Sequence, residues 1–217
     1  GSISSTVSAN TTSGFSVVSY TGTGANATIG HGLGVAPSMI ITKNLIVSDW
    51  YTYHKSLDAT DYIMLNSTNA TADNASLWQD TEPTTSVFSV GVAFGANDIV
   101  AYCFAEKQGF SKFGSYVGNG NADGTFVYTG FKPAFVMLKK TSGTGNWQMF
   151  DDKRVGYNPD NDVLRANLNN VECTSCVKID MLSNGFKLRN TDGDGNTSGG
   201  SYIYMAFAEE PLVGDNP

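Results

Sequence analysis

The chain has 217 residues, of which 41% are hydrophobic and 15% are charged, and its formal net charge at pH 7 is −7. This length suffices for one large domain or two small ones with a buried core. The negative charge and the scattered Lys and Arg residues argue against a nucleic-acid partner, which would favour clustered basic residues, and against anionic membranes. No apolar run approaches the roughly 20 residues of a membrane-spanning helix, so no membrane insertion is expected.

Short strands are predicted along the first half of the chain. The composition is rich in Ser, Thr, Asn and Gly, which favours strands and turns over helices. The continuous apolar run 39–42 is typical of a strand that is buried on both faces. Strands are expected at residues 17–20, 39–42, 50–53, 62–65, 87–90 and 99–105.

The second half shows the same kind of pattern. Asn119-Gly120, Asp123-Gly124 and Asn184-Gly185 predict hairpin turns, because these residues accept a positive φ at little cost. Many short strands with regular turn signals predict an all-β fold of the β-sandwich or jelly-roll type. Strands are expected at residues 126–128, 135–138, 163–164, 177–182 and 202–207.

The two halves of the chain also resemble each other. Segment 19–24 recurs at 115–120, and segment 34–37 matches 130–133, in both cases 96 residues later. Further matches follow in the same order, at offsets that grow from 97 to 103: Trp50 with Trp147, Phe88 with Phe186, and 103–106 with 206–209. Ordered matches over almost the whole chain predict two tandem homologous repeats.

The repeats set the expected domain boundaries. We expect an N-terminal connector at residues 1–13, a first β repeat at 14–108, a second at 109–212 and a C-terminal tail at 213–217. Gly1-Ser2 looks like the remnant of an expression tag. Only Lys107-Gln108 joins the repeats, which is too short for a flexible linker. The repeats are therefore predicted to pack as one pseudo-twofold body.

The three cysteines, Cys103, Cys173 and Cys176, cannot form a complete set of disulfides. Cys173 and Cys176 have the CxxC spacing of redox and zinc sites. A zinc site would need two further ligands, and both histidines lie far away in sequence. No helical pattern follows the motif, as a thioredoxin-like site would require. A local loop feature is the favoured interpretation, and the disulfide state stays open.

No catalytic residue is predicted, although one pair of carboxylates is considered as a possible glycoside-hydrolase pair. Glu106 and Glu209 end matching strands, and glycoside hydrolysis needs two carboxylates roughly 5–10 Å apart. The alternative is that each glutamate accepts hydrogen bonds from turn amides, once in each repeat. Duplicated residues more often serve the duplicated fold, so we expect a protein that is not an enzyme.

The two histidines do not indicate nucleophilic catalysis either. His31 and His54 align with Val127 and Asp151 of the second repeat, so the shared scaffold requires neither. Strand-end or surface roles are expected for both.

Ligand-binding residues are expected at exposed positions that differ between the repeats. Trp50 is matched by Trp147, which favours core packing for both. Trp78 has no such partner and stands in a polar stretch, which favours exposure, where its flat ring would stack on a sugar. The predicted ligand-binding residues are Trp78, His54, Asp192, Asp194 and Asn196.

The second repeat contains an extra segment at 190–200, which predicts a surface loop. The run at 192–196 alternates oxygen donors with glycine, like the start of a calcium loop. The EF-hand pattern then fails, because Thr197 and Ile203 replace its Gly and Glu. A flexible hairpin without cofactor is expected, and the alternative is calcium bound by Asp192, Asp194 and Asn196.

Several segments together resemble a domain family of tailed-phage virion proteins, especially those of phages of marine bacteria. Two of them are GFSKFGSY at 109–116 and LSNGFKLR at 182–189. The others are 3–12, 14–18, 30–37 and 102–106. In that family the unit is typically a distal part of a tail fibre or a related virion protein. The resemblance implies an excised, extracellular fibre domain whose N-terminal connector leads from a longer fibre.

The expected function follows from this resemblance. The chain would attach the virion to a bacterial surface receptor, a glycan or another outer-membrane receptor, and would assemble with other fibre subunits into a homotrimer. Weak binding at each site would be strengthened by avidity. The alternatives are a polysaccharide depolymerase and a purely structural fibre spacer.

Overall fold

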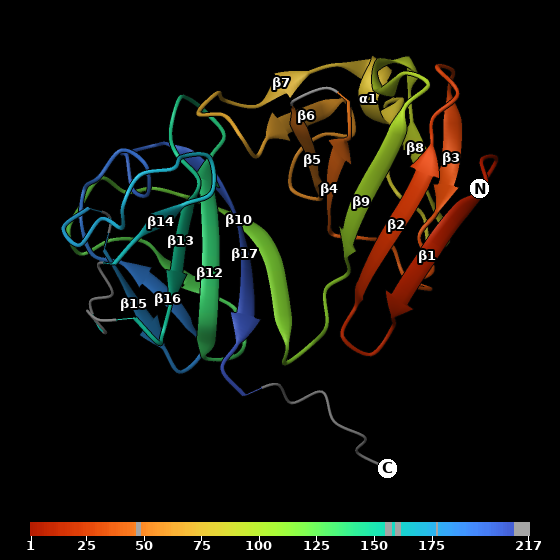
Figure 1. Cartoon of the computed structure of the whole chain (residues 1–217). Helices are drawn as coiled ribbons and strands as arrows, with labels where there is room; N and C mark the ends of the chain where they lie inside the picture. The colour runs from red at the N-terminus through yellow and green to blue at the C-terminus, as the bar shows by residue number, and fades with distance from the viewer. Residues whose placement is uncertain (47–48, 155–157, 159–161, 177, 211–217) are drawn as a thin grey trace, which may run out of the picture. The chain divides into compact units, whose positions relative to one another are not determined.

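The computed structural model of the chain describes residues 1–46, 49–154, 158, 162–176 and 178–210. It contains 45% strand and 3% helix, which confirms the predicted all-β class. The chain divides into two compact units (Figure 1). Unit 1 comprises Gly1–Leu65 and Thr71–Glu106, and unit 2 comprises Asn66–Ala70 and the chain from Lys107 onward. No helix of the described residues is long and apolar enough to cross a membrane.

Unit 1 contains a seven-stranded antiparallel sheet of order β1-β2-β9-β4-β5-β6-β7 and a two-stranded sheet of β3 and β8. A short helix, α1 (Ala75–Trp78), and a 3-10 turn, Val92–Phe94, flank β8. The strands are β1 (Ser5–Asn10), β2 (Phe15–Thr21), β3 (Ala27–Gly30), β4 (Met39–Asn44), β5 (Trp50–His54), β6 (Asp61–Met64), β7 (Ala72–Asp73), β8 (Val87–Val90) and β9 (Asp98–Phe104).

Unit 2 contains a five-stranded sheet of order β10-β17-β12-β13-β14 and a three-stranded sheet of order β11-β16-β15. Its strands are β10 (Ser111–Val117), β11 (Phe126–Tyr128), β12 (Pro133–Lys140), β13 (Gln148–Asp151), β14 (Leu164–Arg165), β15 (Ile179–Leu182), β16 (Gly185–Leu188) and β17 (Ser201–Ala208). Strands β11, β12, β14, β15 and β17 overlap the predicted ones, whereas β10, β13 and β16 were not predicted.

Each unit has its own hydrophobic core, built by alternation along the strands. In β2, Val18 and Tyr20 point into the core of unit 1, whereas Ser19 and Thr21 are exposed. In unit 2 the core includes Val136 of β12 and every second residue from Tyr202 to Ala208 of β17. The apolar run 39–42 is wholly buried, as predicted.

The strand order and register of the two units correspond. The order β2-β9-β4-β5-β6 in unit 1 matches β10-β17-β12-β13-β14 in unit 2. Met39 pairs with Phe104 on one side and His54 on the other. The equivalent pairs of Phe135 are with Phe207 and Asp151, so the offsets of 96, 97 and 103 read from the sequence recur in the register. The tandem repeat itself stays a prediction.

Two segments lie outside the expected domain boundaries. Residues 1–13, expected as a connector, contain β1, which pairs with β2 along its whole length. Asn66–Ala70 follows β6 of unit 1 but belongs to unit 2. There the carbonyl oxygen of Thr68 accepts a hydrogen bond from Gly145 N at 2.9 Å.

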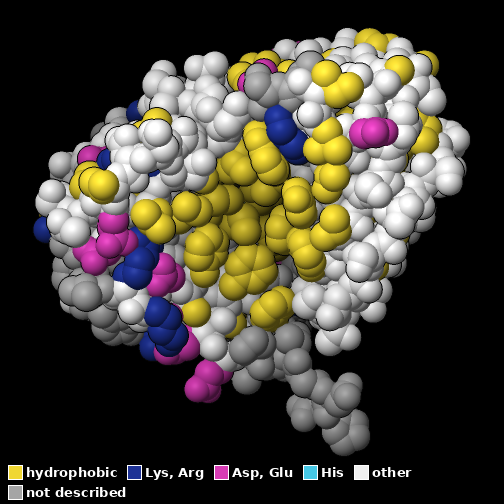
Figure 2. Space-filling model, in the orientation of Figure 1, with side chains coloured by type: hydrophobic (Ala, Val, Ile, Leu, Met, Phe, Trp, Pro, Cys, Tyr) yellow, Lys and Arg dark blue, Asp and Glu magenta, His cyan; other side chains and the backbone are white. Residues whose placement is uncertain are grey.

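The second face of the main sheet of unit 1 is apolar at one end and polar at the other. Phe15 packs against its register partner Phe104 with a ring separation of 4.9 Å. At the opposite end of β2 and β9 the same face carries Ser19, Thr21 and Asp98. Figure 2 shows hydrophobic side chains gathered around the lower end of strand β9 in this view. The polar end of this sheet holds the candidate site.

Candidate ligand-binding site

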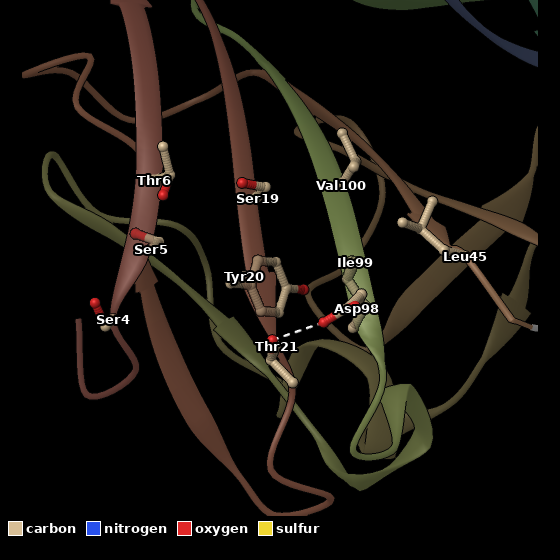
Figure 3. A pocket seen from close by; sticks show the side chains of 10 residues that line it. All are labelled: Ser4, Ser5, Thr6, Ser19, Tyr20, Thr21, Leu45, Asp98, Ile99 and Val100. Carbon is tan, nitrogen blue, oxygen red and sulfur yellow. Dashed lines mark hydrogen bonds between the residues drawn. The ribbon is translucent and has the colours of Figure 1, made fainter.

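A cavity of about 420 Å³ lies at the polar end of strands β1, β2 and β9 in unit 1 (Figure 3). Three strands and the residue that follows β4 contribute to its wall. Hydroxyl groups are the most frequent polar groups in it. The lining residues are Ser4, Ser5, Thr6, Ser19, Tyr20, Thr21, Leu45, Asp98, Ile99 and Val100.

The strand register places the lining side chains. Thr6 pairs with Ser19, and Ser19 pairs with Val100, so these three residues stand in one row across the sheet. Figure 3 shows their side chains on neighbouring strands. The next residues, Tyr20 and Ile99, pair with each other and point into the core, because successive side chains of a strand alternate between the faces.

The cavity offers hydrogen-bonding groups that the fold does not use. Within the described part of the chain, no hydrogen bond involves the hydroxyls of Ser4, Thr6 or Ser19. Thr21 Oγ1 donates to Asp98 Oδ1 at 2.7 Å, which leaves the other carboxylate oxygen of Asp98 available. Leu45 is 60% exposed and adds an apolar wall. The site is suited to a small ligand with several hydroxyl groups and an apolar face.

Residues 1–211 match the family model of a domain of unknown function, DUF7483. The chain belongs to this family. A comparison with curated proteins and another with solved structures found no match.

The structure corrects the prediction that Trp78 is exposed. Trp78 is 2% exposed and lies in the core of unit 1. Helix α1 carries it there, and Asn74 caps this helix by accepting a hydrogen bond from Ser76 N at 3.0 Å. The Trp78 ring packs against Tyr53 and Phe94 at 6.2 and 5.3 Å. Because one helical turn directs this side chain inward, Trp78 contacts core residues and does not line the cavity.

The two tryptophans that were predicted to lie in the core, Trp50 and Trp147, differ in burial. Trp147 is 1% exposed, as expected. Trp50 is partly buried on the second face of the sheet of unit 1, where its ring stacks on Tyr102 at 6.4 Å. Lys43 Nζ lies 5.8 Å from the centre of the Trp50 ring, within the range of a cation–π interaction.

Both histidines are buried and stabilise turns. His54, a predicted ligand-binding residue, is 1% exposed, and its Nδ1 accepts a hydrogen bond from Ser56 N at 3.1 Å. His31 Nδ1 likewise accepts from Leu33 N at 3.2 Å. Burial lowers the pKa of His31, which favours the neutral ring that can accept this bond.

The register also corrects the predicted counterpart of His31. Phe88 pairs with Ile29, whereas Phe186 pairs with Val127, so Ile29 is the equivalent of Val127. The counterpart of His31 is then Thr129, two residues after Val127. The Thr129 hydroxyl is hydrogen-bonded to Phe131 O at 2.6 Å, so different side chains stabilise the same turn.

The loop at 190–200 is tied by hydrogen bonds to the segments around Asn119 and Asn146, whereas a flexible hairpin was expected. Asn196 is wholly buried. Its Nδ2 lies within hydrogen-bonding distance of Asn119 Oδ1, Asn121 O and Asn190 O, and its Oδ1 accepts from Asn119 N at 3.0 Å. Only parts of the loop, such as Gly199, are exposed. The Asn196 side chain is thus engaged in structure.

The two aspartates of this loop are also hydrogen-bonded. Asp194 accepts bonds from Asn146 N, Asn146 Nδ2 and Gln148 Nε2 at 2.8–3.0 Å. Asp192 Oδ1 accepts from Asp194 N at 2.8 Å. The described residues contain no group of three or more His, Cys, Asp or Glu side chains that could hold a metal ion.

The structure also shows the state of the three cysteines and the partners of the two strand-end glutamates. Cys173 and Cys176 form a disulfide with a Cα–Cα distance of 5.8 Å, and Cys103 is a buried free thiol. Burial raises the pKa of Cys103 to about 12. Glu106 forms an ion pair with Lys55, and Glu209 one with Lys132, each at 2.5 Å.

The cavity beside Thr6, Ser19 and Asp98 was not predicted. Its serines and threonines are ordinary surface residues in the sequence, and only the pairing of β1 with β2 brings them together. The sequence contained one indication of this site, namely that Asp98, a charged residue, directly precedes the predicted strand 99–105.

Proposed function

We propose that this chain is a non-catalytic module of a tail fibre or related virion protein, which attaches the virion to a glycan on the bacterial host surface. The observation that carries the proposal is the cavity of unit 1, in which the hydroxyls of Ser4, Thr6 and Ser19 take part in no hydrogen bond among the described residues. The resemblance of several segments to tailed-phage virion proteins provides the biological setting.

A glycan fits the chemistry of this cavity. Hydroxyl groups both donate and accept hydrogen bonds, so Thr6 and Ser19 can match the hydroxyls of a sugar in either role. The free carboxylate oxygen of Asp98 is a stronger acceptor for a sugar hydroxyl. Leu45 and Val100 offer apolar contact to the C–H groups of the sugar ring. The volume of about 420 Å³ is in the range of small-molecule sites.

The proposal includes assembly. Open, shallow sites of this kind bind weakly, and several copies in one fibre raise the apparent affinity without any new contact. A homotrimer in the assembled virion provides such copies. The working location is outside the cell, on the virion.

The experiment uses the fluorescently labelled full chain and cells of candidate marine host bacteria, with and without removal of their surface polysaccharide. Saturable binding that is lost after removal, without release of oligosaccharide, is expected. Ser19→Ala and Asp98→Asn should each reduce this binding. Ser8→Ala is the matched control, because Ser8 is an exposed residue of β1 outside the cavity.

The other outcomes separate the alternatives. Released oligosaccharide would show a depolymerase and direct attention to Glu106 and Glu209. Absence of binding by an assembled oligomer, over a panel of hosts, would leave a structural spacer. Equal loss of binding in Ser19→Ala and Ser8→Ala would show that the cavity is not the site.

A further inference from the structure

Strand β11 of unit 2 exposes two aromatic side chains on one face. Phe126 is 43% exposed and Tyr128 is 63% exposed, while Val127 between them is buried in the core. Residues i and i+2 of a strand share a face, and their Cα atoms are about 6.6 Å apart. The two rings therefore stand next to each other on the outer face of the β11-β16-β15 sheet.

A glycine on the neighbouring strand makes room for these rings. Gly185 of β16 pairs with Tyr128. A Cβ atom at Gly185 would stand 3.0 Å from Cζ of Phe126 and 2.1 Å from the carbonyl oxygen of Val127. The Phe126 ring thus lies over β16 at Gly185, where no side chain stands in its way. Phe126 and Tyr128 together form an exposed aromatic surface.

Ion pairs border this aromatic surface. Lys187, the register partner of Phe126, lies with its Nζ 2.8 Å from Asp123 Oδ1. Arg189 Nε lies 2.9 Å from Asp180 Oδ2. The Asp123 side chain is 79% exposed, and Lys187 lowers its pKa, so its carboxylate is available as an acceptor. Donors and acceptors thus stand along one side of the rings.

A cavity of about 380 Å³ adjoins the other end of the surface. It is lined by Gly130, Phe131, Lys132, Ser183, Glu209 and Glu210. A Cβ atom at Gly130 would stand 3.6 Å from the Tyr128 hydroxyl oxygen, so this ring reaches the edge of the cavity. Lys132 Nζ lies 2.5 Å from Glu209 Oε2, and its hydrogen bond lowers the pKa of Glu209. A carboxylate and an ammonium group therefore stand side by side in this cavity.

The fold does not require the two rings. Since Ile29 is the register equivalent of Val127, the counterparts of Phe126 and Tyr128 in unit 1 are Thr28 and Gly30. The same arrangement of strands forms there with small residues at both positions. Large apolar side chains that are exposed and not needed for folding indicate a binding surface.

We propose that Phe126, Tyr128 and the adjoining cavity form a binding site for a neutral polysaccharide of hexose units, separate from the cavity in unit 1. The C–H faces of successive sugar rings stack on Tyr128 and Phe126. Sugar hydroxyls bond to the Lys132–Glu209 pair in the cavity and to the Lys187–Asp123 pair at the border.

The charged residues around Phe126 and Tyr128 favour a neutral polysaccharide over an anionic or a hydrocarbon ligand. Lys132, Lys187 and Arg189 are balanced by Glu209, Asp123 and Asp180, and Glu210 adds one more acid. An anionic polymer would gain no net attraction from these paired charges and would be repelled by Glu210, and a hydrocarbon ligand would leave the bordering ions unsolvated. A neutral, hydroxylated chain matches both the rings and the ion pairs.

The test is a titration of the full chain, followed by NMR of its aromatic and amide groups. The probes are hexasaccharides of β-1,4-glucose, β-1,3-glucose and β-1,4-mannose, with a hexamer of galacturonate as the anionic probe. At least one neutral probe should cause saturable shifts of the Phe126 and Tyr128 ring signals. Tyr128→Ala should weaken its binding about tenfold, whereas Tyr128→Phe, which keeps the ring, should bind nearly normally.

Val171→Ala is the matched control, because Val171 is 90% exposed elsewhere in unit 2. It should bind like the unchanged chain, and the amide spectra show whether each variant is folded. Three results would overturn the proposal: no ring shift with any neutral probe, a response to galacturonate alone, or unchanged binding by folded Tyr128→Ala.

The two proposed sites can fail separately. If Ser19→Ala loses host-cell binding but no probe reaches the rings, only the unit 2 site is wrong. If the rings bind a neutral hexasaccharide and Ser19→Ala still binds cells, the site assigned under the proposed function is wrong instead.

Discussion

Lys139 Nζ donates a hydrogen bond to the carbonyl oxygen of Asn69 at 2.8 Å, although 70 positions of sequence separate the two residues. The same ammonium group lies 2.8 Å from Lys140 O and 3.4 Å from Thr68 O. Lys139 is wholly buried. Its equivalent in the register of unit 1, Lys43, is only partly buried and lies over the Trp50 ring. A buried ammonium thus holds Asn66–Ala70 within unit 2.

The first prediction is that the contribution of Lys139 to the free energy of unfolding rises with pH. Burial lowers the pKa of Lys139 to about 8, below its value of about 10.4 in an unfolded chain. Between these values the unfolded chain binds more protons, so the contribution of Lys139 to the free energy of unfolding rises with pH. We expect the difference in this free energy between the unchanged chain and Lys139→Met to grow from pH 8 to pH 10.

Denaturant unfolding at several pH values measures this difference. Using the difference removes the opposite effect of buried Tyr and Cys groups, whose raised pKa values lower stability at high pH. Lys43→Met, at the equivalent position of unit 1, is the comparison, because Lys43 is only partly buried. A flat difference for Lys139→Met would show that its ammonium is not held as the geometry indicates.

A second prediction concerns two tyrosines at equivalent positions, Tyr20 and Tyr116. Both are buried, and burial raises the pKa of both. Tyr116 Oη donates to Gly195 O at 2.8 Å, in the loop that only the second repeat has. The Tyr20 hydroxyl has no partner among the described residues. Tyr20→Phe should therefore leave the free energy of unfolding unchanged or raise it by up to about 1 kcal/mol.

The matched change Tyr116→Phe should lower this free energy by about 1 to 2 kcal/mol, because it leaves the Gly195 carbonyl without its donor. Thermal or denaturant unfolding of both variants tests the pair. Equal effects would mean that the Tyr20 hydroxyl has a partner in solution, such as a bound water.

A third prediction concerns Asn196. Asn196→Asp keeps the size of the side chain but removes the amide donor and buries a charge, so it should lower the free energy of unfolding by about 3 kcal/mol or more. Asn119→Asp is a milder comparison, since Asn119 is more exposed. Chemical denaturation compares the variants. A stable Asn196→Asp chain that requires calcium would revive the metal hypothesis for this loop.

A fourth prediction concerns Gly185. A Cβ atom there would stand 2.1 Å from the carbonyl oxygen of Val127, a distance that the paired backbones cannot accept without moving apart. Gly185→Ala should destabilise unit 2 by about 3 kcal/mol or more. Gly193→Ala is the control, because a Cβ atom at Gly193 would find its nearest neighbour, Thr197 Oγ1, at 3.6 Å. The melting temperatures of the two variants should therefore differ clearly.

Much of the fold was predictable because it depends on local alternation. The apolar run 39–42 and the alternating residues near Val87–Val90 carry the signal of buried strands, and both are strands in the structure. The offsets of the ordered matches between the halves recur in the register pairs of Met39 and Phe135, which the structure supplied. Strands β1, β3, β7, β10, β13 and β16 were not predicted. In β1 the exposed, polar sequence has no apolar face to indicate a strand.

The candidate sites were not predictable in the same way, because exposure depends on what lies opposite a residue. Trp78 stands in a polar stretch, yet one helical turn directs it into the core. The alternation of Phe126, Val127 and Tyr128 indicated a strand but not which side faced solvent. The core contacts of Val127 decided that.

By itself the sequence determined the all-β class and the approximate positions of many strands, and it predicted a correspondence between the two halves. Each of these depends on the order of residues along the chain, through the two-residue period of a strand and the spacing of turns. Only the tertiary structure decided that Trp78, His54 and Asn196 are buried, and that Thr6 meets Ser19 and Tyr128 meets Gly185. Those outcomes depend on contacts between distant segments, whose pairing the local pattern does not encode.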